Sequence, residues 1–166
     1  NETARNSHTA FLFTSIAYPF KFREKVKGGY TKAMTNKTAV TSAPILPLLA
    51  DRWSPRSYDK SYQLTATELT SILEAGRWAP SANNAQPTRY FVVAREDKLH
   101  AGIVATLGGW NQAWAGDASA IILVGVAATN PDGNVNPWAT YDAGQAVAHL
   151  SVQAHALGLH VHQMAG

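Results

Sequence analysis

The sequence contains no cysteine, and this absence excludes disulfide bridges, thiol catalysis and cysteine-based zinc sites. It also lacks a G-x-S-x-G elbow, a G-x-G-x-x-G turn and a P-loop, so serine-hydrolase, Rossmann dinucleotide and nucleoside-triphosphatase chemistry have no motif support. Its first apolar run, residues 10–20, is too short and too polar to span a bilayer. Most of the nearby lysines follow that run, whereas a secretory signal carries its positive charge before the apolar stretch.

The composition is that of one globular domain: 166 residues, of which 46% are apolar. The formal net charge of +3 is unevenly placed. Residues 1–37 hold seven basic and two acidic residues, and the remainder holds seven basic and nine acidic residues. The globular part therefore has no basic field to attract nucleic acid, and we expect neither nucleic acid nor a membrane as its partner.

We expect residues 1–40 to be an N-terminal extension, flexible or foreign to the domain, and residues 41–166 to form the domain itself. Met34 is followed by a polar stretch and resembles a natural start, with residues 1–33 as upstream sequence. A basic arm that touches a membrane or a partner is the alternative. The chain stops at Gly166, directly after an expected strand, so we expect C-terminal sequence to be missing.

The best-specified local feature is a helix start at Thr65-Ala-Thr-Glu68, which matches a capping box. Leu64 and Leu69 occupy the positions of a hydrophobic staple, and apolar residues at helical spacing continue the helix to about Trp78. The same reasoning predicts further helices over 45–50, over 96–107 and from Pro137 to a C-cap at Gly158, strands over 89–94, 120–128 and 159–164, and a loop over 81–87. The order of these elements predicts an α+β domain with helices packed on a sheet.

A first candidate site is the short segment that carries Arg52, Ser54 and Arg56. Two guanidinium groups and a hydroxyl suit an anion, because arginine donates in a fixed fork to phosphate oxygens. The alternative is a pair of surface arginines bound to Asp51 and Asp59.

A second candidate is the proline-bounded stretch from Pro80 to Pro87, which holds three side-chain amides among small residues. Amides donate and accept together, as the edge of a planar heterocycle requires. An ordinary loop whose asparagines cap neighbouring elements is the alternative.

A third candidate is Asn111 with Trp110 and Trp114, since a tryptophan can cover a ring while an amide bonds its edge. The tryptophans could equally pack in the core or at a subunit contact. His155, His160 and His162 suggest a metal site, but no further ligand follows at a recognised spacing, and no metal is predicted.

Five segments together resemble the nitroreductase family in order and spacing. They are RWSPR at 52–56, AGRWAPSANNAQP at 75–87, WNQAWAGDA at 110–118, YDAGQA at 141–146 and LGLHVHQMAG at 157–166. The likeness covers about residues 45–166, and residues 1–40 lie outside it.

The resemblance implies an α+β fold with a mixed sheet flanked by helices, in a domain-interlocked homodimer with FMN at the interface. Arg52 would meet the FMN phosphate, and Ser54 and Arg56 the ribityl chain or a pyrimidine oxygen. Asn111 would bond the pyrimidine ring, while the backbone at Ala165 and Gly166 would face flavin N5 and O4. The residues that would approach the flavin of the partner subunit are Pro80, Ser81, Ala82, Asn84 and Gln86.

The implied activity is an FMN-dependent oxidoreductase that passes electrons from NADH or NADPH to nitroaromatic, quinone or similar acceptors in a ping-pong cycle through flavin N5, and we expect a cytoplasmic location. The flavin carries this chemistry, so no catalytic side chain is expected. The sequence departs from the family in lacking a further C-terminal stretch. It also has Trp114 where some relatives carry a basic residue, which leaves Arg56 as the source of positive charge near O2. A non-catalytic flavin-binding protein and an inactive truncated fragment are the alternatives.

Overall fold

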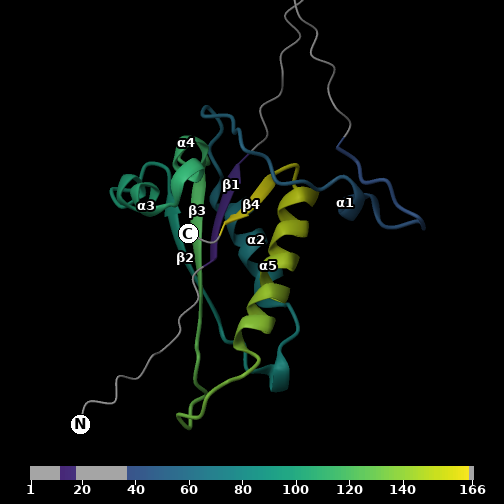
Figure 1. The fold of residues 1–166 in the computed structure, drawn as a ribbon, viewed down its shortest axis with the longest axis vertical. Helices are drawn as coiled ribbons and strands as arrows, with labels where there is room; N and C mark the ends of the chain where they lie inside the picture. The colour runs from purple at the N-terminus through teal and green to yellow at the C-terminus, as the bar shows by residue number, and fades with distance from the viewer. Residues whose placement is uncertain (1–11, 18–36, 165–166) are drawn as a thin grey trace, which may run out of the picture.

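A four-stranded sheet with helices on both faces organises the molecule, and the computed structural model describes residues 12–17 and 37–164 of it (Figure 1). The strands are β1 (Leu12–Ala17), β2 (Thr88–Ala94), β3 (Ala120–Val126) and β4 (His160–Met164), in the spatial order β2-β3-β1-β4. The α-helices are α1 (Pro47–Ala50), α2 (Ala66–Arg77), α3 (His100–Thr106), α4 (Gln112–Ala115) and α5 (Ala139–Ala156), and two 3-10 turns are η1 (Ala82–Asn84) and η2 (Gly109–Asn111). The predicted α+β class is confirmed.

The start of α2 follows the predicted capping box. The backbone N–H of Glu68 donates to Thr65 Oγ1 at 3.2 Å, and the Thr65 N–H donates to Glu68 Oε2 at 2.8 Å. The Tyr62 hydroxyl also donates to Glu68 at 2.6 Å, and this bond, more than those from Thr65, lowers the pKa of the Glu68 carboxyl. Orphan amides of the first turn are thus satisfied by residues within the same short segment.

The long helix α5 ends where the sequence predicts. Gly158 has φ 78°, the left-handed conformation that favours glycine. Its N–H donates to His155 O, and the next residue, Leu159, donates to Ala154 O, both at 2.9 Å. These two bonds form a Schellman motif that closes the helix and turns the chain directly into β4.

Two buried clusters lie on the two sides of the sheet. On one side α2 and α5 cover β3 and β4, with Ile72, Ile122, Val124, Val147, Leu150, Ala154, Leu159 and Val161 in the cluster. The second cluster joins α4 and the end of β4 to the chain before α2, with Tyr58, Leu107, Trp114, Ala115, Ala118 and Met164 in it. β3 is buried along most of its length, as its continuous apolar run predicts.

The strand β1 differs from the expectation for residues 1–40. That segment was expected to lie outside the domain, whereas Leu12–Ala17 pairs with both β3 and β4 in the middle of the sheet. The sequence analysis compared residues 10–20 with a membrane span and with a secretory signal, but not with a strand. The rest of residues 1–36, including the proposed start at Met34, lies outside the described residues.

Two further details differ from the sequence-based expectations. The helix predicted over 96–107 begins only at His100, because the Asp97 carboxylate accepts the Leu99 N–H at 2.8 Å and holds the chain in a turn. The sheet was expected to be mixed, but all three pairings among the described strands are antiparallel. Within residues 37–164 none of the helices has both the length and the apolar character that crossing a membrane would need.

Candidate functional site

The first predicted cluster lies against β4. Pro55 is fully buried, and its carbonyl oxygen lies 2.8 Å from Nδ1 of His162 on β4. Two residues earlier, Trp53 meets the ring of His160 edge-on at 5.8 Å. These contacts fix the segment that carries Arg52, Ser54 and Arg56 beside the last strand of the sheet.

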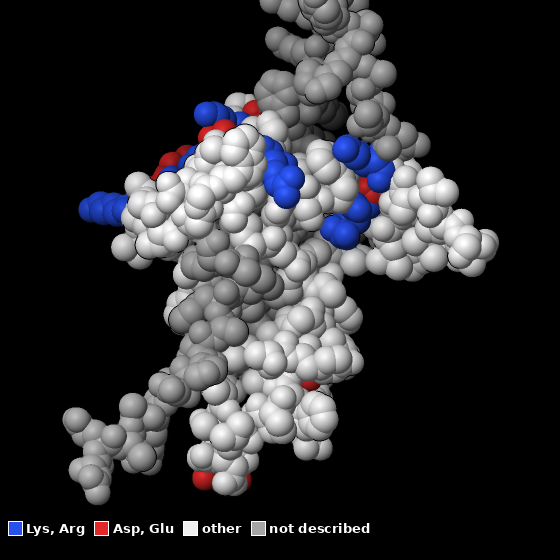
Figure 2. All heavy atoms as spheres, viewed as in Figure 1, with Lys and Arg blue, Asp and Glu red and all other residues white. Residues whose placement is uncertain are grey.

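Among the described residues, no carboxylate forms an ion pair with Arg52 or Arg56. The ion pairs among the described residues are Lys60–Asp117 and Arg77–Glu74. Asp51 accepts instead from the Thr38 hydroxyl at 2.7 Å. Asp59 accepts from the backbone and hydroxyl of Ser61, so its carboxylate is also engaged elsewhere. The two guanidinium groups are therefore available to an anion. On the face seen in Figure 2, basic side chains gather on the upper part and the lower part shows almost no charge.

Asn111 lies at the end of η2, half-buried, directly before α4. On α4, Trp114 is 5% exposed and packs against the ring of His162 at 4.5 Å and that of Tyr58 at 6.1 Å. Trp114 thus has a core role, one of the alternatives considered for it, whereas Trp110 is 72% exposed. Through Trp114 and His162, Asn111 belongs to the same region as the two arginines.

His160 on β4 is held in its uncharged form in this region. Burial, together with the smaller effects of nearby His155 and Arg52, lowers the pKa of its imidazole to about 4. The rings of His155 and His160 are 5.0 Å apart and nearly perpendicular, and the Nδ1 atom of each is buried with no hydrogen-bond partner in the part of the chain that the structure describes. His160 is therefore neutral at neutral pH. Among the residues that the structure describes, no three His, Cys, Asp or Glu side chains are arranged to hold a metal ion.

The second predicted cluster, the loop after α2, is conformationally strained. Asn83, Asn84 and Gln86 have φ values of 53°, 55° and 46°, all in the left-handed region. Asparagine tolerates this region better than most residues, yet each such position costs about 1–3 kcal/mol unless local bonds compensate. Two bonds help here: the Gln86 N–H donates to Ser81 Oγ at 3.1 Å, and the Gln86 amide donates to Asn84 Oδ1 at 2.8 Å.

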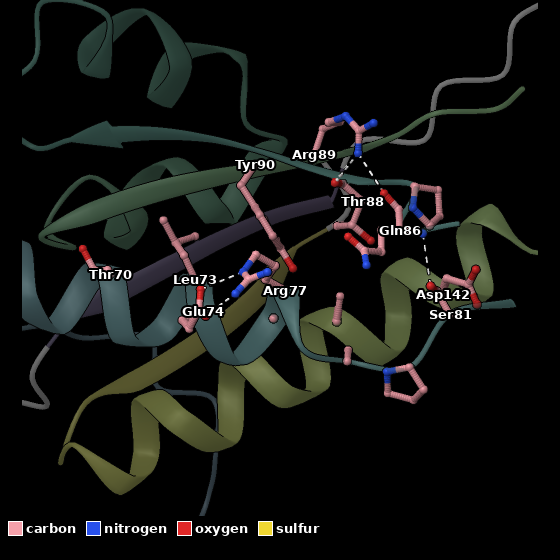
Figure 3. A pocket seen from close by; sticks show the side chains of 15 residues that line it. Thr70, Leu73, Glu74, Arg77, Ser81, Gln86, Thr88, Arg89, Tyr90 and Asp142 are labelled. Carbon is pink, nitrogen blue, oxygen red and sulfur yellow. Dashed lines mark hydrogen bonds and ion pairs between the residues drawn. The ribbon is translucent and has the colours of Figure 1, made fainter. Parts of the chain in front are cut away.

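The loop is anchored to the first turn of α5 by Asp142, which is only 2% exposed. The Ala82 N–H donates to this carboxylate, with N–O distances of 3.2 and 3.3 Å. A cavity of about 530 Å³ opens beside the anchor between α2, α5 and β2, and Pro80, Ser81 and Gln86 form part of its wall (Figure 3).

Tyr90 on β2 points into this cavity, as Figure 3 shows. Its hydroxyl is buried and has no hydrogen-bond partner among the described residues. Burial raises the pKa of the Tyr90 phenol to about 12, so the hydroxyl stays protonated. It lies against Gly76 on α2, where an added Cβ would be 2.4 Å from the oxygen.

The two clusters lie at opposite ends of α5 (Figure 1). The loop is bound at Asp142 in the first turn, and the arginine segment meets His160, which contacts His155 in the last turn. At 1.5 Å per residue these ends are about 20 Å apart. The structure therefore brings Arg52, Ser54, Arg56 and Asn111 together and keeps Pro80, Ser81, Ala82, Asn84 and Gln86 apart from them. Ala165 and Gly166 lie outside the described residues.

The sequence analysis did not single out two residues of these regions, Asp142 and Tyr90, and it considered His162 only as a possible metal ligand. A signal existed for two of these three residues. His162 alternates with His160 and Met164 on one face of β4, and Asp142 is an acidic residue among small ones in the expected helix. The role of Tyr90 had no sequence signal, because it depends on a glycine of another element.

The domain carries two arginines without a carboxylate partner among the described residues at one end, and a strained, amide-rich loop at the other. These two separate clusters suit the two parts of a polar, anionic ligand. The Nitroreductase family model matches residues 49–108. A solved structure described as an oxidoreductase containing FMN superposes with a TM-score of 0.71 at 35% identity, over 78% of this chain and 67% of that one. A nitroreductase from Desulfovibrio desulfuricans in complex with FMN superposes with a TM-score of 0.59 at 31% identity, over 70% of this chain and 65% of that one.

Among curated proteins, the NAD(P)H nitroreductase YdgI of Bacillus subtilis is 33% identical over 87 residues, which is 52% of this chain and 41% of that protein. An oxygen-insensitive NADPH nitroreductase of Helicobacter pylori is 32% identical over 77 residues, 46% of this chain and 36% of that protein. The matched region thus spans about two fifths of these relatives. The chain belongs to the nitroreductase family.

Proposed function

We propose that the chain is the FMN-binding part of an oxidoreductase that passes electrons from NADH or NADPH to nitroaromatic, quinone or similar acceptors in a ping-pong cycle. Two FMN-containing structural neighbours and two relatives named as NAD(P)H or NADPH nitroreductases support this proposal. The main observation in its favour is that the two arginines beside β4 have no carboxylate partner among the described residues.

The arginine segment fits the phosphate end of FMN. A phosphate dianion needs cationic donors, and Arg52 and Arg56 have no carboxylate partner among the described residues. The position of Arg52 is fixed by its neighbour Trp53, which packs on His160, and its charge is close enough to lower the pKa of that histidine. In this proposal Arg52 binds the phosphate, while Ser54 and Arg56 bind the ribityl chain or a pyrimidine oxygen.

The pyrimidine ring would be held by Asn111 and by the backbone at Ala165 and Gly166. Bound FMN supplies the redox chemistry at its N5 atom, and the protein needs no acid or base of its own for that step. Arg56 places positive charge near O2, since Trp114 is buried in the core and carries no charge. The neutral state of His160 leaves the positive charge of this region to the two arginines and to Lys37, whose Nζ lies 5.4 Å from the centre of the Trp53 ring.

The amide-rich loop is assigned to a second copy of the chain in this proposal. It lies about 20 Å along α5 from the arginine segment, at the other end of that helix. We therefore assign Pro80, Ser81, Ala82, Asn84 and Gln86 to the flavin of the partner in a homodimer. The strain at three of the loop's backbone positions supports a binding role, because such conformations concentrate at ligand sites.

The visible spectrum of the purified protein tests this function. Yellow protein that bleaches when NADPH is added without oxygen is the expected result. Yellow protein that never bleaches would instead indicate a flavin-binding role without catalysis. Colourless protein that cannot be reconstituted with added FMN would refute both and would be the behaviour of an inactive fragment.

Substitution of Arg52 tests the phosphate assignment. Arg52→Ala should weaken FMN binding about 30- to 150-fold, from the loss of about 2–3 kcal/mol of charged hydrogen bonding. Lys98→Ala is the control, because it removes the same charge from an exposed position on the chain before α3. Flavin fluorescence measures both dissociation constants, and circular dichroism shows whether each variant is folded. Equal affinity for Arg52→Ala and the control would remove the assignment.

A further inference from the structure

His162 stands where three parts of the proposed flavin site meet. It belongs to β4, the strand that leads to Ala165 and Gly166. One side of its ring reaches the carbonyl of Pro55, within the arginine segment. The ring also packs against Trp114, three residues after Asn111.

The hydrogen bond to Pro55 determines which nitrogen of the His162 imidazole carries the proton. A carbonyl oxygen can only accept, so Nδ1 of His162 must carry the hydrogen across the 2.8 Å contact. Pro55 is fully buried, and without this donor its carbonyl would lack the partner that the structure gives it. The bond therefore determines where the residues on either side of Pro55, Ser54 and Arg56, lie relative to β4.

We propose that His162 is a positioning residue for the flavin, which sets the Arg52–Arg56 segment in register with the end of β4 through Pro55. The inference rests on the proposed function. His162 itself does not touch the flavin in this scheme. Its Nδ1–H holds the residues that would bind the phosphate and ribityl chain at a fixed position beside β4, and the Trp114 contact keeps the ring from rotating away.

Two variants separate the hydrogen bond from the ring. His162→Asn keeps a donor at the place of Nδ1 but loses most of the packing on Trp114. His162→Phe keeps a ring of similar size on Trp114 but leaves the Pro55 carbonyl without a donor. His149→Phe is the control, since it makes the same replacement at an exposed position on α5.

FMN dissociation constants, measured by flavin fluorescence on the full chain, give the first readout. We expect His162→Phe to bind FMN about tenfold more weakly, because about one net hydrogen bond is lost, and His162→Asn to stay within about threefold of the unmodified protein. Unchanged affinity in His162→Phe would overturn the proposal. Equal weakening in both variants would overturn it as well, since ring packing would then be the cause.

Hydrogen exchange of residues 52–58 in the flavin-free protein gives a second readout. Faster exchange in His162→Phe than in His162→Asn is expected, because only the first variant releases the Pro55 carbonyl. This measurement does not depend on flavin binding. If the unmodified protein binds no FMN, the proposed function fails, and the tie between β4 and the arginine segment is still supported or refuted by exchange.

Discussion

Protonation of His160 should destabilise the fold at mildly acidic pH. The ring of His160 lies against Trp53 and His155, and its Nδ1 is buried with no hydrogen-bond partner among the described residues. Arg52 adds a positive charge nearby. Protonation would therefore place the positive charge of this ring in a poorly hydrated site, next to the charge that Arg52 already carries.

The size of the effect follows from the pKa difference between the two states. Burial lowers the pKa of His160 from 6.5 to about 4 in the folded protein, so between these values the unfolded chain binds more protons. The contribution is complete above pH 6.5 and is lost as the pH falls through 4. The difference corresponds to about 3 kcal/mol at most, and because the ring is partly open to solvent we expect about half of it, near 1.5 kcal/mol.

Urea unfolding at pH 7.5 and pH 4.5 provides the assay. His160→Phe keeps an aromatic ring that cannot titrate, so its free energy of unfolding should fall by about 1.5 kcal/mol less over this interval than that of the unmodified protein. His100, whose burial also lowers its pKa, acts alike in both proteins and cancels in the comparison. Identical pH dependence in the two proteins would refute the reasoning, as would a variant that is more sensitive to acid.

Three further predictions concern the fold. Gly76→Ala should destabilise the protein by about 2 kcal/mol despite the better helix propensity of alanine, because its Cβ would be 2.4 Å from the Tyr90 hydroxyl; adding Tyr90→Phe should recover part of the loss, and purely additive unfolding energies would contradict the clash. Thr65→Ala should cost about 1 kcal/mol in chemical denaturation through loss of the capping box, and a change below the error of the measurement would argue against it. Ile72→Ala, at a fully buried position in the larger cluster, should cost about 3–4 kcal/mol by the same assay, and a cost under about 1 kcal/mol would mean that the site collapses around the gap.

Features set by neighbouring residues were predictable from the sequence. The helix start at Thr65 and the helix end at Gly158 depend on bonds within a few residues, and both occur where the sequence predicts them. The helix predicted over 96–107 was too long, because one Asp97 side chain bond outweighs helical spacing over a single turn. The central strand β1 could not be inferred, since its partners lie more than a hundred residues further along the chain.

The candidate site shows the same division. Residue types and spacing pointed to Arg52, Ser54, Arg56 and Asn111, which the structure places in one region. The sequence gives no measure of how far the amide-rich loop lies from them, because that distance is set by the length of α5. His162 was considered only as a possible metal ligand. Its contact with Pro55 was missed because the partner is a backbone carbonyl 107 residues away, which every residue type carries alike.

The separation of the two clusters along α5 has a consequence for genetic complementation as well as for binding. If each flavin is shared as proposed, one gene copy with Arg52→Ala and another with Gln86→Ala would each encode a protein with two damaged sites. In a cell that makes both chains, random pairing would give mixed dimers in which one site collects both defects and the other is intact. About a quarter of all sites would then be whole. Two defective copies could complement each other, which a site contained within one subunit does not permit.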